Sequence, residues 1–589
     1  MRIFIFLFFL LFSSLLKGSE VSVIELHSTK SLDQLVLEQN NSENEIETNL
    51  SEESINNDES NVIDEDNQSS KQNEELVENN IIDVSEVKTN IDIEKLNFYF
   101  SNITIINSQP LYDEFIKILT ESNIQNSENQ EVIFLFINKL IDLGEIQKAY
   151  NLIKLLNVEN DKNIVFYKTI ELNYLFSTNQ LVEACELKNE FNLLKFKLEN
   201  YYLEKADIFC LVMEQKIDEA NLLNSILIET EINIDEYFQN LINLLFNYNN
   251  DIQSVQLNLP NQYSKDLIFL YSAMQRIAEL PLSEEFLDID PNNLAIPIIL
   301  SNSSNINLRL KAANKAYLNN LISVESLAAL YQSVDFNSKQ LNDPNNTLKE
   351  ISNNELKMAY YFQLANIQIF PSSRLKVILD FWKFAESISL EKISYSLTYN
   401  IVSTIDPLAE NSNNASKIAT SLIYSRDFEK ASKWISLADN SSESNTELEN
   451  VKLLYDLYQS DNSEKILEYI TNNYSNLINN KSNDINEILF VLMSSLGIEK
   501  NANFNLVFEK VMDDRKIPTM FINSEIKKNI ELNNELNLFL LILLSLNEKD
   551  WFEIHPEHLR LVLTGIIKYK NSELLRDTLL DIFENNKIF

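Results

Sequence analysis

A short pattern that returns about every 35 residues constrains this chain more than any other feature. It consists of a small or polar residue, any residue, an apolar residue, two further residues and an alanine, and its alanines are Ala149, Ala184 and Ala220. Large apolar residues stand three and seven positions after each alanine, which is the spacing of one helix face. A second apolar stripe precedes each alanine by nine and twelve positions and indicates a partner helix. The pattern therefore predicts a row of antiparallel helical hairpins.

The alanines are expected to mark the closest approach of the two helices in each hairpin. Antiparallel helices can approach closely only where a side chain is small, while larger residues one turn away fill the space beside the contact. The residues three positions after the alanines, which we expect to be buried on the same stripe, are Leu152, Leu187 and Leu223. A further copy of the pattern ends at Ala431, with Trp434 on its stripe, so the period is expected to extend beyond the first three units.

The period and register resemble those of tetratricopeptide repeats, whose unit is a helix-turn-helix of 34 residues, over about a quarter of the chain. The resemblance implies an α-solenoid of antiparallel hairpins. No glycine stands twelve residues before the alanines, and Asp161, Phe196 and Ile232 occupy the place of the family's closing proline. The binding of peptide carboxylates known for that family is therefore not carried over to this chain.

The wider chain is also similar to a group of secreted helical proteins of alphaproteobacteria. The residues that carry this similarity are Cys185, Cys210, the helix around Arg374 and the segment from Ala431 to Trp434. The group brings no activity with it.

Glycine is scarce, with four residues in 589, against an average usage of about 7%. Phosphate-binding loops, nucleophile elbows and tight β-hairpins all need glycine for positive φ or close backbone approach. Helices joined by Asn- and Ser-rich turns need less of it, because asparagine tolerates the left-handed cap conformation. Codon bias in an AT-rich genome is an alternative origin of the composition. In either case the absence of glycine-dependent motifs favours an all-α chain.

The N-terminus predicts export. Arg2 is followed by an unbroken apolar run from Ile3 to Phe12, which is typical of a secretory signal peptide. The run is shorter than the about 20 residues that a membrane-spanning helix needs, and we expect cleavage near Gly18 or Ser19. The mature chain would then be periplasmic or secreted; an uncleaved signal that anchors it in the inner membrane is the alternative. No transmembrane helix is expected after the signal peptide.

The net charge of −40 argues against nucleic acid as a ligand, because phosphate binding needs a basic surface. Part of the charge is local, since the stretch from Glu20 to Lys95 has 21 acidic and four basic residues. The same stretch holds no aromatic residue and no proline, so it cannot bury enough apolar surface to offset its ordering entropy. The acidic surface either keeps the chain soluble or attracts cations and basic partners.

Changes in composition divide the chain into six segments. The boundary near residue 96 is the sharpest, because aromatic and apolar-periodic sequence begins there. Four of the ten prolines fall between residues 251 and 300 and interrupt the helices of that part. The predicted segments are a signal peptide at 1–18, a disordered acidic tether at 19–95, tetratricopeptide-like repeats at 96–250, a proline-interrupted joint at 251–300, helical repeats at 301–479 and a C-terminal helical cap at 480–589.

The two cysteines are the most specific local signal. In an oxidising compartment a lone pair tends to form a disulfide. Cys185 and Cys210 lie almost equally far from the turn expected near Lys197 and Leu198, so antiparallel helices would place them at the same height. Two buried free thiols and a redox role are the alternatives to a structural disulfide.

Histidine is limited to His27, His555 and His558. The last two are three residues apart and suggest a metal pair. The preferred interpretation is a helix start, because Pro556 suits the first helical position and Glu557 the positive end of the helix dipole. We therefore predict no metal site, no cofactor and no catalytic residue.

These observations predict a non-enzymatic scaffold for protein–protein interaction in the cell envelope. Binding is expected on the concave face, which carries side chains of the first helix in each hairpin. The alternative is a peptidoglycan-acting hydrolase or lytic enzyme on a helical solenoid, because paired carboxylates are abundant. Glu386-Ser387, however, lacks the glycine-containing sequel found in lytic transglycosylases. Trp382, Trp434 and Trp551 are expected in the core rather than as ligand-stacking platforms.

Overall fold

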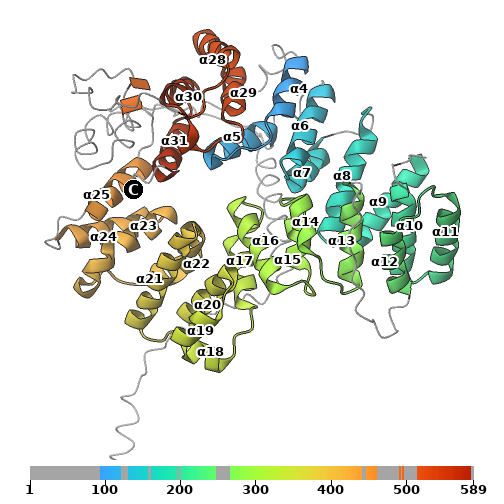
Figure 1. Ribbon diagram of the computed structural model, residues 1–589, viewed down its shortest axis with the longest axis horizontal. Coiled ribbons are helices and arrows are strands. Elements are labelled where there is room, and N and C mark those ends of the chain that lie inside the picture. The colour runs from blue at the N-terminus through green and yellow to red at the C-terminus, as the bar shows by residue number, and fades with distance from the viewer. Residues whose placement is uncertain are drawn as a thin grey trace, which may run out of the picture. The chain divides into compact units, whose positions relative to one another are not determined.

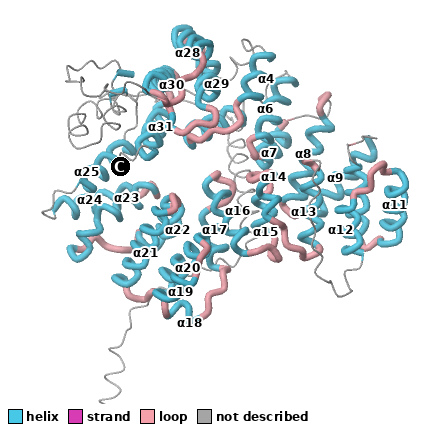
Figure 2. The backbone as a smooth tube through the Cα atoms, viewed as in Figure 1, coloured by secondary structure: helices cyan, strands magenta, loops and turns pink. Residues whose placement is uncertain are grey.

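A computed structural model describes residues 93–120, 130–156, 161–194, 198, 201–246, 265–440, 446–459, 490–491, 494–495 and 514–585. Within these ranges the protein is all-helical, with 26 α-helices, two short 3-10 helices and no strand (Figure 2). The predicted signal peptide and nearly all of the predicted tether lie outside the described residues. The first described helix begins at Ile93, three residues before the predicted start of the repeats.

The first nine described helices include the hairpins that the repeat predicts. From α6 to α11 each helix packs on the next one along the chain (Figure 1). The bounds in this part are α4 (Ile93–Asn102), α5 (Gln109–Thr120), α6 (Gln130–Asp142), α7 (Ile146–Leu155), α8 (Ile164–Ser177), α9 (Leu181–Leu194), α10 (Tyr202–Met213), α11 (Ile217–Thr230) and α12 (Glu236–Phe246).

The repeat alanines lie at helix contacts. Ala149 on α7, Ala184 on α9 and Ala220 on α11 have no solvent-exposed surface, and neither has Ala431 in the later copy. Each alanine lies on the second helix of its hairpin, next to the first helix. A larger side chain at this position would force the two backbones apart.

The leucines three positions after the alanines do not all behave alike. Leu152 and Leu187 are buried, whereas Leu223 is 37% exposed, so its predicted burial is wrong. The first two face the next hairpin, because α8 packs on α7 and α10 packs on α9. No such hairpin follows α11, since α12 packs mainly on α10 and α13 (Leu267–Ile277) instead.

The first position of the pattern is a left-handed helix terminus. Gly144, Asn179, Gln215 and Arg426 have φ values of 85°, 64°, 61° and 61°. In each case the next backbone N–H bonds to the carbonyl oxygen five residues earlier, as in the 2.8 Å bond from Glu145 N to Leu140 O. This is the Schellman arrangement, which satisfies carbonyl groups at the end of a helix.

The same arrangement recurs outside the repeats. It explains how the helices of this chain can end without a glycine. It ends α13 at Glu279, α16 (Ile306–Leu318) at Asn320 and α21 (Pro371–Ser387) at Ser389. Asparagine takes this conformation at three positions, as the composition suggests, but glutamine, glutamate, serine, arginine and lysine take it elsewhere. These residues accept a conformational cost of about 1 kcal/mol that glycine would avoid.

The middle of the described chain begins with α13, which packs on α8 of the hairpins and on α12. Two helices of six residues follow in the segment that contains the prolines, as the predicted joint suggests. The further bounds here are α14 (Glu284–Ile289), α15 (Ala295–Leu300), α16, α17 (Val324–Gln332), α18 (Ser338–Asn342), α19 (Pro344–Glu350), α20 (Asn354–Ile367), α21 and α22 (Glu391–Val402).

The last described helices pack on the first ones. Helix α31 packs on α5 and α25, and α29 packs on α4. The Ser108 hydroxyl donates to Asp581 at 2.6 Å, and the Tyr569 hydroxyl donates to Glu114 at 2.9 Å. The bounds in this part are η4 (Ala409–Asn414), α23 (Ala415–Tyr424), α24 (Phe428–Asn440), α25 (Thr446–Gln459), α28 (Met520–Leu532), α29 (Glu535–Leu546), η6 (Trp551–Glu553), α30 (Pro556–Lys568) and α31 (Ser572–Asn585).

The three tryptophans lie in the core. Trp382, Trp434 and Trp551 are each at most 5% exposed. The indole nitrogen of Trp382 donates to Thr398 at 2.9 Å, and that of Trp551 donates to Asp581 at 2.7 Å. Their burial leaves none of these rings available for stacking on a ligand.

The left-handed termini predict that glycine stabilises the protein at one repeat position. Gln215→Gly should raise the free energy of unfolding by about 0.5–1 kcal/mol, because glycine adopts a positive φ without steric cost. Part of the gain is offset because glycine also increases the conformational entropy of the unfolded chain. Chemical denaturation of the full chain measures the change. The matched control is Ser333→Gly, at a helix terminus with a right-handed φ of −73°, where we expect no stabilisation. Destabilisation by Gln215→Gly would contradict the assignment.

Candidate functional site

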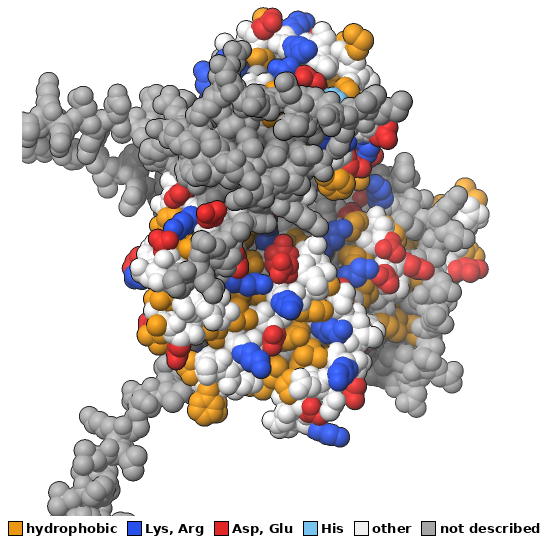
Figure 3. All heavy atoms as spheres, turned by 60° about the vertical axis from the view of Figure 1, so that its left-hand side comes forward, with side chains coloured by type: hydrophobic (Ala, Val, Ile, Leu, Met, Phe, Trp, Pro, Cys, Tyr) orange, Lys and Arg blue, Asp and Glu red, His pale blue; other side chains and the backbone are white. Residues whose placement is uncertain are grey.

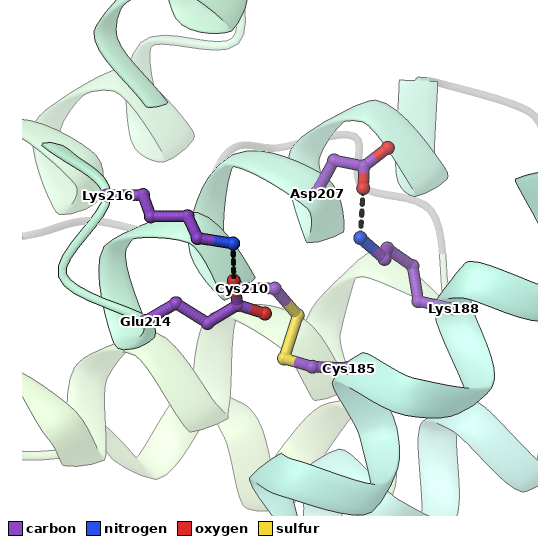
Figure 4. Close-up of a disulfide and its surroundings, with 6 residues drawn as sticks. All are labelled: Cys185, Lys188, Asp207, Cys210, Glu214 and Lys216. Atoms are coloured by element: carbon purple, nitrogen blue, oxygen red, sulfur yellow. Dashed lines mark hydrogen bonds and ion pairs between the residues drawn. A yellow bond between two sulfur atoms is a disulfide. The ribbon is translucent and has the colours of Figure 1, made fainter. Parts of the chain in front are cut away.

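The disulfide predicted from the two cysteines is present in the structure. Cys185 on α9 and Cys210 on α10 are bonded, with their Cα atoms 5.6 Å apart (Figure 4). One turn away, Lys188 of α9 forms an ion pair with Asp207 of α10. The two pairs lie at matching heights because the helices are antiparallel. The disulfide therefore links the second hairpin of the row to the third.

The histidines do not converge on one point. His555 is the N-cap of α30, and its Nδ1 accepts a hydrogen bond from the backbone N–H of Glu557 at 3.1 Å. His558 is buried, and its Nε2 lies 2.9 Å from the Ser545 hydroxyl. No group of three or more potential metal ligands occurs among the described residues. His27 lies outside the ranges that the structure describes.

A large cavity of the described chain lies where the hairpins meet α13–α16. Its volume is about 1160 Å³. The hairpin side is formed by the ends of three first helices, namely α6, α8 and α10, and by the segment before α5. The polar side chains of the lining include Asn138, Asp142, Lys162, Asn163, Asn173, Tyr202, Lys265, Asp266, Asp290, Asn292, Asn293, Lys315 and Asn319.

A turn before α15 forms one wall of this cavity and clamps the α6–α7 turn. The side-chain oxygen of Asn293 accepts from the backbone N–H of Ile146 at 3.0 Å, and Asn292 Nδ2 donates to the carbonyl of Leu143 at 3.0 Å. Gly144 lies directly beneath, and a Cβ atom at that position would approach Asn292 Cβ to 2.2 Å. Only glycine therefore permits both the left-handed turn and the close approach of this wall.

The opposite wall is held by a buried polar chain across α8, α10 and α13. The Tyr202 hydroxyl donates to Asn173 Oδ1 at 2.7 Å, and Asn173 Nδ2 donates to Asp266 at 2.7 Å. Burial, followed by the negative charge of Asp266, raises the pKa of Tyr202 well above its ordinary value. The phenol thus stays protonated and serves as a fixed donor.

The charges around the cavity balance. The charged side chains in its lining are three carboxylates and three amines, namely Asp142, Asp266, Asp290, Lys162, Lys265 and Lys315. Burial is the main influence on Lys315 and lowers the pKa of its ammonium, while Asp290 raises it. Asp290 also accepts from Asn293 through the backbone N–H at 3.0 Å and through Nδ2 at 2.7 Å.

Amides are the most frequent polar groups in the lining. Most are paired with aspartate carboxylates, with one another or with the backbone, as when Asn138 Nδ2 donates to Asp142 at 3.3 Å and Asn319 Nδ2 donates to Asn292 Oδ1 at 2.9 Å. The Asn163 Nδ2 atom is an exception, since it is buried and has no hydrogen-bond partner among the described residues.

The described lining contains no histidine and no cysteine. Two of its carboxylates, Asp266 and Asp290, accept hydrogen bonds from asparagine side chains. The arrangement can therefore hold a ligand through neutral donors and acceptors with charged groups at fixed places. Sequence analysis missed these residues, because the repeat pattern places the first helices but not the segment that packs against them.

No known protein family, curated protein or solved structure matches this chain. None of the helices within the described ranges combines the length and apolar character needed to span a membrane.

The disulfide should contribute substantially to stability. Cys185→Ser/Cys210→Ser is expected to lower the free energy of unfolding by about 3.5 kcal/mol in the chain-entropy model, given a loop of 25 residues. Denaturant titration with and without reductant measures it. Reductant should shift the unfolding midpoint of the wild type and leave that of the double variant unchanged. Equal midpoints for the oxidised and reduced wild type would contradict the prediction.

His558 should make stability depend on pH. Burial, and secondarily Lys549, lowers the pKa of His558 to about 4. In the unfolded state the histidine keeps its ordinary pKa of about 6.5, so it binds a proton more readily there than in the folded protein. The free energy of unfolding therefore falls as the pH drops from about 6.5 towards 4. Between pH 7 and pH 5 the loss from this residue should be about 2 kcal/mol.

His558→Gln is the control for this titration, because glutamine retains a hydrogen-bonding group without an ionisable one. Chemical denaturation of both proteins at pH 7 and pH 5 isolates the contribution of His558, since the carboxylates titrate equally in both. The same pH dependence in wild type and variant would show that His558 is not buried in its neutral form.

Proposed function

We propose that this chain is an exported, non-enzymatic α-solenoid that acts as an interaction scaffold and holds a polypeptide segment in the cavity between the hairpins and α13–α16. The observation that carries the proposal is the cavity itself. At about 1160 Å³ it exceeds the usual range of about 300–1,000 Å³ for small-molecule sites.

The position of the cavity supports a scaffold built from hairpins. Among the hairpin helices, α6, α8 and α10 contribute to its lining as the first helices of three consecutive hairpins, and α7 contributes Ile146. In stacked helical repeats these helices present the side chains of the concave face. Helix α13 lies against α8, so the ligand would occupy the space that α13 leaves open.

The chemistry of the lining suits a peptide backbone. A peptide group offers one donor and one acceptor, and an asparagine amide can meet both. The three lysines and three aspartates would select among side chains of the bound segment.

The compartment follows from two separate features. The apolar N-terminus is typical of a signal peptide, and a disulfide between the only two cysteines is typical of an oxidising environment. The proposed location is therefore the periplasm or the exterior. An uncleaved signal would keep the same fold on an inner-membrane anchor.

Site-specific photocrosslinking tests the scaffold proposal. A photoreactive phenylalanine analogue at Asn138, inside the cavity, should crosslink one defined polypeptide in the cells that produce this protein. The matched control is Asn440, an exposed asparagine near the end of α24, where the same product should be absent. A product of equal yield at both positions, or none at Asn138, would contradict the proposal.

Two further measurements separate the alternatives. Purified protein should release no muropeptides from peptidoglycan, and reproducible release would favour the hydrolase instead. Capture at Asn138 should persist above about 0.15 M salt, where the Debye length is about 8 Å. Loss of capture at that salt concentration would assign binding to the acidic surface rather than to the cavity.

A further inference from the structure

Helix α11 carries an apolar stripe that no described element covers. Leu222 is 63% exposed, Ile226 is 47% exposed and Leu223 between them is 37% exposed. The opposite face of the same helix is buried through Ala220 and Leu227, next to α10. The stripe has the spacing of one helix face, so it forms a continuous ridge.

The repeat register identifies this ridge as a helix-docking position. Leu223 corresponds to Leu152 and Leu187, which are 2% and 7% exposed because the first helix of the next hairpin covers each of them. Helix α12 does not take that place. It packs on α10 and α13, and it meets α11 through the amide pair of Asn224 and Gln239, 2.9 Å apart. Among the described residues, no helix occupies at α11 the surface that binds a helix twice within the row.

The charge around the ridge indicates which helix fits. Between Lys216 and Lys265 the sequence has seven acidic residues and no lysine or arginine. Asp218, Glu219 and Glu229 are exposed on α11 itself. On the face drawn in Figure 3, in contrast, lysines and arginines are interspersed with acidic side chains. Two copies of α11 would repel each other, whereas a basic helix would be attracted.

Two acidic residues that follow α11 are not available to a partner. Glu231 and Asp235 form ion pairs with the buried Lys205 at 3.0 Å and 2.7 Å. This pairing fixes the end of α11 against α10 and α12. The ridge therefore lies on a helix whose C-terminal end is held in place by buried ion pairs.

We propose that α11 binds a cationic amphipathic helix of a partner protein, which packs its apolar stripe on Leu222, Leu223 and Ile226 and places lysines or arginines beside Asp218, Glu219 and Glu229. The partner helix takes the place that the first helix of a further hairpin would occupy. This surface is separate from the cavity and does not depend on the function proposed for it.

The test uses the full chain and two synthetic peptides of about 18 residues, long enough to form a helix on binding. One carries leucines on one face and lysines beside them, and the other has glutamates in place of the lysines. Fluorescence anisotropy should detect binding of the leucine–lysine peptide alone. Leu222→Ser/Ile226→Ser should weaken this binding by about tenfold or more. Glu219→Gln/Glu229→Gln should weaken it and reduce its dependence on salt.

Two control variants make the result specific. Val182→Ser removes an apolar side chain that is 69% exposed on α9 and should leave binding unchanged. Asn138→Trp, which fills part of the cavity, should also leave it unchanged. The proposal is overturned if the leucine–lysine peptide does not bind, if Leu222→Ser/Ile226→Ser binds it like the wild type, or if the glutamate peptide binds equally well. It is also overturned if light scattering finds a dimer that the same double variant abolishes, because the ridge would then join two copies of this chain.

Discussion

The contact between the Asn292–Asn293 turn and the α6–α7 turn is the interaction on which the candidate site depends. The side chains of Asn292 and Asn293 form hydrogen bonds with backbone groups at the end of α6 and the start of α7. The residues they join are almost 150 positions apart in sequence. Because Gly144 has no Cβ, the two turns can approach closely enough for these bonds to form. The cavity exists because this contact holds α13–α16 beside the hairpins.

The described ends of the chain are held by contacts of the same kind. Asn547 accepts from the backbone N–H groups of Thr104 and Ile105, and Asp581 accepts from both Ser108 and Trp551. Burial is the largest influence on Asp581 and raises the pKa of its carboxyl group. Two directional donors at one carboxylate give this junction a single geometry. The C-terminal helices thus cover the first helices of the described chain as well as α25.

The scarcity of glycine affects the backbone conformation at the helix ends more than the number of helices. At ten positions of the described chain a residue other than glycine adopts positive φ, and at seven of them the next backbone N–H bonds to the carbonyl oxygen five residues earlier, in the preceding helix. The conformational cost is distributed over many sites, and tertiary packing offsets it at each one. Asparagine at some of these positions could be expected from its known tolerance, but Gln215 and Arg426 could not. Their conformation follows from the apolar residues on both sides, which must point into the same core.

The helical class, the hairpin period and the four buried alanines could be predicted from the sequence, because they depend on contacts between neighbouring helices and leave a periodic pattern. The sequence also placed the Cys185–Cys210 disulfide, since two antiparallel helices around one turn bring equidistant residues together. Only the tertiary structure decided which hairpin faces are covered. It left Leu223 exposed where Leu152 and Leu187 are buried, directed His558 into the core, and brought Asn292 and Asn293 to Gly144. Such contacts join segments that are far apart in the chain and have no common period, so no local pattern records them.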